Sequence, residues 1–89
     1  MRIQVRRTGG FAGIERRAEI ETSGLRDAGD WRELAERAMA DGADTPSAGV
    51  PDGYHYVITF DDDRTVHCAD PGLTDAQRAL ISRVLKEGA

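Results

Sequence analysis

The sequence predicts an α+β fold, in which a four-stranded antiparallel sheet carries two helices packed on one face, in the order ββαββα. Three observations lead to this prediction. Two pairs of segments alternate apolar and polar residues, which is the period of a half-buried strand. A turn-forming segment joins the members of each pair, as in a hairpin. After each pair comes an apolar stripe with the period of a helix.

The first hairpin is predicted from residues 2–8 and 14–22, which both alternate. In the first segment Ile3 and Val5 stand between polar neighbours. In the second segment Arg16 falls on the otherwise apolar face. We therefore expect Arg16 near an end of the sheet, where its stem covers apolar surface and its guanidinium reaches water.

The first helix is expected to begin at Asp30, because Asp30 and Glu33 have the spacing of a capping box. An earlier start at Asp27 is the alternative, which Gly29 disfavours. Gly42 follows Asp41 and is a natural stop. The apolar stripe between them begins at Trp31 and returns at spacings of three and four residues. Its other members are Leu34, Ala35, Ala38 and Met39.

The second hairpin follows a loop at 43–53 that is rich in proline and glycine. Residues 54–60 and 64–69 are predicted strands, with the three aspartates between them forming the turn. A register that keeps the apolar residues on one face fixes the expected pairs. These are Phe60 with Arg64, Ile58 with Val66, and Tyr56 with Cys68.

The closing helix is predicted to start with a capping box between Thr74 and Gln77 and to end at Gly88. Its apolar stripe is Leu80, Ile81, Val84 and Leu85. Together the strand faces and helix stripes predict one core. We expect it to contain Ile3, Val5, Trp31, Leu34, Tyr56, Ile58, Leu80, Ile81 and Val84.

Bulk composition narrows the functional classes. The chain has 89 residues, which suits one domain over 1–89, and its net charge of −4 gives no support to nucleic-acid binding. Its start has no apolar block of the kind a signal peptide or membrane span needs. The single cysteine excludes an internal disulfide and fits a reducing compartment. We expect a cytoplasmic protein that is monomeric when free.

Metal and catalytic constellations are not evident. The only soft ligand candidates are His55, His67 and Cys68, and strand alternation turns Cys68 away from the two histidines. Asp61–Asp63 lacks the glycine and the closing glutamate of an EF-hand loop, so we interpret it as a turn. No nucleophile stands in a recognisable catalytic motif. We therefore expect neither a metal, nor a cofactor, nor an enzyme.

The first hairpin is locally basic within this acidic chain. Glutamates on the same strand pair would neutralise much of that charge, so we expect a solvated, salt-bridged face without a ligand. The arginines are Arg2, Arg6, Arg7, Arg16 and Arg17, and the glutamates are Glu15, Glu19 and Glu21.

The loop of the first hairpin contains the most unusual residue of the chain. Phe11 stands among Gly9, Gly10 and Gly13, which permit a positive φ and offer no side chain to cover it. An aromatic residue in so open a loop is either turned inward as a cap on the sheet edge or turned outward as a contact for a partner. Both alternatives remain open at the level of the sequence.

The segment Arg7-Thr8-Gly9-Gly10-Phe11-Ala12-Gly13 resembles the GGFA-type segment of the emfourin family. The strand Tyr54–Thr59, the hairpin return and the closing helix resemble that family as well. Emfourins are small protein inhibitors of thermolysin-like metallopeptidases of the protealysin type. The resemblance implies such a peptidase as partner, cytoplasmic or exported together with the inhibitor, and no cofactor. It also implies a contact through Gly9, Gly10, Phe11, Ala12 and Gly13.

A second interpretation belongs to another class of protein. The chain could be a non-inhibitory protein-binding module of a small regulatory α+β type, in which the same loop serves no protease. A gene for a thermolysin-like peptidase beside the gene of this chain would favour the inhibitor.

Overall fold

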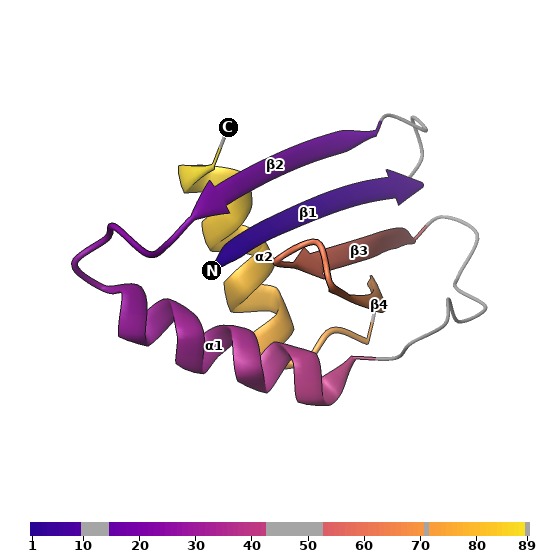
Figure 1. The fold of residues 1–89 in the computed structure, drawn as a ribbon. Coiled ribbons are helices and arrows are strands. Elements are labelled where there is room, and N and C mark those ends of the chain that lie inside the picture. Colours follow the sequence, from indigo (N-terminus) through magenta and orange to yellow (C-terminus); the bar gives the residue numbers. More distant parts are fainter. Residues whose placement is uncertain (10–14, 43–52, 71, 89) are drawn as a thin grey trace.

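The computed structural model describes residues 1–9, 15–42, 53–70 and 72–88. Its elements follow the predicted order ββαββα (Figure 1). They are β1 (Arg2–Gly9), β2 (Arg16–Glu21), α1 (Ala28–Asp41), β3 (Tyr54–Phe60), β4 (Arg64–Asp70) and α2 (Asp75–Glu87).

The four strands form one antiparallel sheet in the order β2-β1-β3-β4. β1 therefore lies inside the sheet, although it comes first in the chain, and its pairing with β3 joins the two hairpins. The predicted register of the second hairpin is confirmed in all three pairs. Between the hairpins, Ile3 pairs with Phe60 and Val5 with Ile58, which brings their apolar residues onto a common face.

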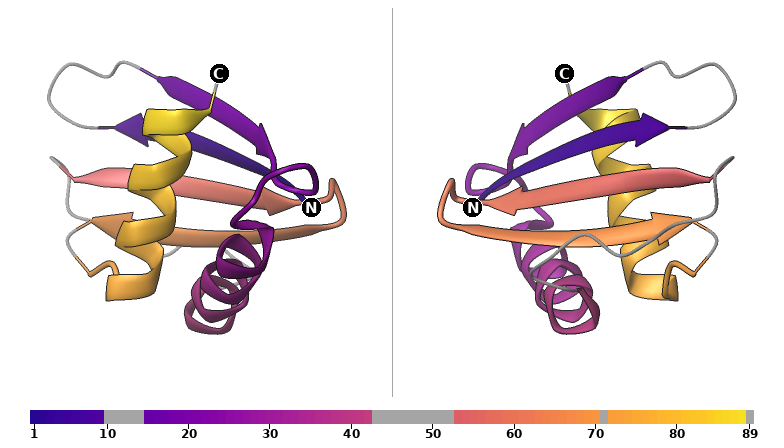
Figure 2. Two further views of the ribbon diagram at one scale, coloured as in Figure 1. Left: turned by 90° about the vertical axis from the view of Figure 1, so that its left-hand side faces the viewer. Right: turned by 90° about the vertical axis from the view of Figure 1, so that its right-hand side faces the viewer.

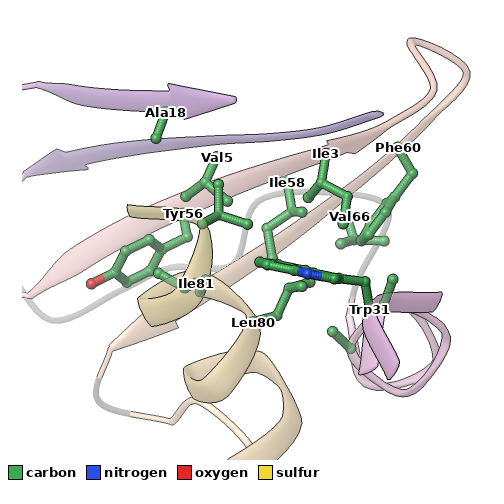
Figure 3. Close-up of a cluster of buried hydrophobic side chains, with 13 residues drawn as sticks. Ile3, Val5, Ala18, Trp31, Tyr56, Ile58, Phe60, Val66, Leu80 and Ile81 are labelled. Carbon is green, nitrogen blue, oxygen red and sulfur yellow. The ribbon is translucent and has the colours of Figure 1, made fainter. Parts of the chain in front are cut away.

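Both helices cover that common face. In Figure 2, α2 lies in front of the strands in the left view and behind them in the right view. Trp31 of α1 and Leu80 of α2 point toward Ile58 and Ile3 of the sheet (Figure 3). One buried cluster results. It comprises Ile3, Val5, Ala18, Trp31, Ala35, Ala38, Tyr56, Ile58, Phe60, Val66, Leu80, Ile81 and Val84.

The core prediction is confirmed except at Leu34, which is only partly buried. Trp31, Ala35 and Ala38 occupy the positions of α1 that are fully buried. Leu34 lies at the rim between the helices, in a shallow hollow that it shares with polar side chains such as Arg37 and Arg83. The apolar stripe of α1 is wider than the face of the helix that is buried, so Leu34 lies at its edge.

The predicted start of α1 at Asp30 is wrong, and the alternative start at Asp27 agrees with the structure. The helix begins at Ala28 after Asp27, and Asp27 makes no side-chain hydrogen bond to the helix. Its carboxylate instead accepts a hydrogen bond from the Arg83 guanidinium of α2 at 2.7 Å. That guanidinium also lies over the Trp31 ring, 4.1 Å from its centroid. A tertiary contact between the helices therefore replaces the local cap that Asp30 was expected to form.

The predicted cap of α2 is confirmed. The Gln77 amide donates to Thr74 Oγ1 at 3.2 Å, and the Thr74 amide donates to Gln77 Oε1 at 3.0 Å. At the other end of the helix, the Arg16 guanidinium donates to the Leu85 carbonyl at 3.0 Å. Arg16 thus lies near the end of the sheet as expected, and its cation satisfies an otherwise open helical carbonyl.

Leu80 offers a direct test of this core, because it is fully buried between α2 and the sheet. Leu80→Ala should lower the free energy of unfolding by about 2–5 kcal/mol, measured by urea denaturation. Leu25→Ala is the matched control, since Leu25 is 39% exposed and should lose about 0.5 kcal/mol or less. Equal small losses in both variants would contradict the packing of α2 on the sheet.

Candidate functional site

The predicted contact loop begins where β1 ends. Gly9 is the last residue of β1, and β2 begins at Arg16. Gly10, Phe11, Ala12 and Gly13, the other predicted contact residues, lie outside the described residues. Two adjacent, hydrogen-bonded strands therefore hold both ends of this segment.

Gly9 has a conformation and a location that require glycine. Its φ is +90°, a region that side chains with a Cβ rarely occupy. It pairs with Tyr54 of β3, and a Cβ on Gly9 would lie 2.7 Å from the carbonyl oxygen of Gly53. The chain thus leaves the sheet at Gly9 in direct contact with the start of β3.

We call the point at which the chain leaves the sheet the Gly9 corner. A cluster of Arg7, Tyr54 and Tyr56 packs beside this corner, on the helix side of the sheet. The Arg7 guanidinium lies 4.5 Å from the centroid of the Tyr54 ring, and the Tyr54 and Tyr56 rings are 6.3 Å apart. Burial raises the pKa of Tyr56, so its hydroxyl stays protonated at neutral pH. Arg7 Nε is buried and has no hydrogen-bond partner among the described residues. The base of the loop is therefore packed.

Cys68 lies on the face opposite to His55 and His67, as predicted. Val57 pairs with His67, and Tyr56 pairs with Cys68, so His67 and Cys68 belong to opposite faces. Burial raises the pKa of the Cys68 thiol to about 11, which keeps it protonated and a poor metal ligand. Across the described ranges, no three His, Cys, Asp or Glu side chains come together as a metal site would require.

The three aspartates of the second hairpin act as a turn. Asp61 and Asp62 have φ values of 55° and 59°, the left-handed region that a tight turn uses. Both side chains bind Arg2, since Asp61 accepts from its backbone amide and Asp62 pairs with its guanidinium, each at 2.8 Å. These carboxylates are thus engaged within the protein.

Comparison with known proteins decides the family. The Emfourin family model matches residues 5–85, nearly the whole chain. This chain belongs to the Emfourin family. The resemblance carried by the glycine loop and the Tyr54–Thr59 strand is thereby confirmed. No curated protein and no solved structure gives a significant match.

Membership of the Emfourin family implies a role as a metallopeptidase inhibitor, with a protease as partner. The family is one of inhibitors. Neither helix of the described structure is long and apolar enough to cross a bilayer. In such an inhibitor the surface that meets the protease is the functional site.

The geometry at Gly9 predicts that one added methyl group at this position destabilises the fold. Gly9→Ala should lower the free energy of unfolding by about 1–3 kcal/mol, because the methyl group meets the Gly53 carbonyl and φ is unfavourable. Gly29→Ala is the control, since a Cβ there has open space and lies in the first turn of α1. The control should be neutral or gain up to about 1 kcal/mol in urea denaturation. A neutral Gly9→Ala would show that the corner is not tightly packed.

Because Cys68 lies on the face opposite to His55 and His67, we expect that folding needs no metal. Dialysis against EDTA should leave the melting temperature and the circular dichroism spectrum unchanged. A fall of many degrees that added zinc restores would show that these three side chains bind a structural ion.

Proposed function

We propose that this Emfourin-family protein inhibits a thermolysin-like zinc metallopeptidase of the protealysin type by placing the Gly9–Gly13 loop in its active-site cleft. The observation that carries the proposal is the corner at Gly9. There the chain leaves the sheet beside β3, over a packed cluster formed by Arg7, Tyr54 and Tyr56. We also infer a cytoplasmic location and a monomeric free state.

A protease inhibitor of this kind needs a projecting segment whose ends do not move. The ends of the Gly9–Gly13 loop lead into β1 and β2, which pair as far as Arg7 with Arg16. Fixed ends lower the conformational entropy that is lost when the loop is ordered on the enzyme. They also hold the loop in place, so that it blocks the cleft without offering a readily cleaved bond.

Phe11 is the proposed anchor of the contact. Thermolysin-like enzymes have a hydrophobic pocket on the primed side of the cleft, next to the zinc ion. An aromatic side chain that fills such a pocket is a common hot spot of protein–protein binding. The alternative, in which Phe11 turns inward and caps the sheet edge, gives a different result in the same experiment.

The test is Phe11→Ala, assayed by inhibition of a panel of thermolysin-like peptidases with an unrelated zinc peptidase as negative control. Loss of the anchor should weaken inhibition by about 30- to 1000-fold and leave the melting temperature within a few degrees of the wild type. Phe60→Leu is the matched control, because Phe60 is a core aromatic residue. It should lower the melting temperature and retain inhibition in proportion to the folded fraction.

If Phe11→Ala behaves like Phe60→Leu, then Phe11 belongs to the core and the contact lies elsewhere, with the 43–53 loop as the next candidate. Should the wild-type protein inhibit no thermolysin-like enzyme, the chain acts as a binding module without a protease target.

A further inference from the structure

The face of the sheet opposite the helices carries a row of side chains that crosses all four strands. Arg17 of β2 pairs with Arg6 of β1, Arg6 pairs with Val57 of β3, and Val57 pairs with His67 of β4. His55, two residues before Val57, lies on the same face. None of the described helices covers this row, and in the right view of Figure 2 the strands lie in front of α2.

Two adjoining hollows make this face concave. One has a volume of about 450 Å³ and reaches from Arg17 across the sheet to His67. The other, of about 230 Å³, extends toward Thr8 and His55. Both hollows are lined by Arg6, Val57 and His67, so they form one groove, which we call the Arg6 groove.

Two arginines, Arg6 and Arg17, and one glutamate, Glu19, line the groove, so its lining carries one more positive than negative charge although the protein as a whole is acidic. Arg2 forms ion pairs with Glu19 and Asp62, and Arg17 forms one with Glu15. Arg6 is exposed and has no acidic partner within the described part of the chain. It stands next to Val57 and His67, neither of which can neutralise it.

A carboxylate-bearing peptide segment has the chemistry that fits this groove. The Arg6 guanidinium can bind a carboxylate through two parallel hydrogen bonds, and the half-buried Val57 offers apolar surface to the stem of a glutamate. The guanidinium repels a metal cation that the two histidines would otherwise attract. A second copy of this face would bring a second Arg6 guanidinium to the groove and, over the described ranges, no free carboxylate, which like-charge repulsion disfavours.

The groove opens toward the proposed inhibitory loop. Thr8 and His55 are paired and line its end, and the next pair of the same strands is Gly9 with Tyr54. A partner whose cleft receives the loop therefore has its surface beside this groove. We infer that the Arg6 groove binds an acidic segment next to the active-site cleft of the peptidase. This inference rests on the proposed function and adds a second, electrostatic contact to it.

Arg6→Gln tests the inference, with Arg32→Gln as control because Arg32 is an exposed arginine on α1, away from the groove. At low salt Arg6→Gln should inhibit the peptidase about 10-fold less tightly, mainly through slower association. The difference should shrink as salt is raised from about 0.05 M to 0.5 M, because ions screen exposed charges. Arg32→Gln should match the wild type at every salt concentration, and both variants should keep the wild-type melting temperature.

A second measurement needs no peptidase. Titration with hexaglutamate, followed by NMR, should shift the backbone amides of Arg6, Val57 and His67 in the wild type and not in Arg6→Gln. If Arg6→Gln inhibits like the wild type at low salt and hexaglutamate shifts none of these amides, the inference is overturned while the proposed function stands. A wild type that binds hexaglutamate here but inhibits no thermolysin-like enzyme contradicts the proposed function instead. Dimerisation that Arg6→Gln abolishes, seen by sedimentation, would assign the groove to a second copy and overturn the inference.

Discussion

β1 lies between β2 and β3, and its antiparallel pairing with β3 joins the two halves of the chain. This register sets Val5 against Ile58 in the core and Gly9 against Tyr54 at the end of the sheet. The helices can share a single core only because this pairing makes one surface out of two hairpins. The same pairing fixes the corner from which the proposed inhibitory loop leaves, so the fold and the proposed function depend on one set of backbone hydrogen bonds.

Much of the fold could be predicted, because its signals are local in the sequence. Alternation identifies the strands, and the short turn of the second hairpin fixes its register without knowledge of the rest of the chain. The cap of α2 was predictable for the same reason, since both of its partners lie within one helical turn. The start of α1 was not, because Asp27 is held by Arg83, which lies far away in the sequence. The burial of Leu34 was predicted wrongly, because the periodicity of a helix does not show how wide a part of its apolar stripe the neighbouring elements cover.

The two parts of the candidate site also differ in whether their signals are local in the sequence. The Gly9–Gly13 segment could be proposed from its composition and stays a prediction, since three glycines around one phenylalanine are visible in the sequence alone. The Arg6 groove was not, because the order of the strands is needed to bring Arg6 beside Val57 and His67. On the sequence the hairpin arginines were matched with glutamates of the same hairpin. The structure supports this for Arg2 and Arg17 and leaves Arg6 without an acid among the described residues.

The central position of the first strand also has a consequence for synthesis on the ribosome. The hairpin of β1 and β2 is complete early, yet one edge of β1 stays unpaired until β3 has been made. At ordinary rates of translation this lasts a few seconds, during which an apolar strand face and open backbone groups are exposed. The contact between β1 and β3 is distant in sequence, so its closure is a slow step of folding. We therefore expect this small protein to be most prone to aggregate during the interval in which the edge of β1 is exposed on the nascent chain.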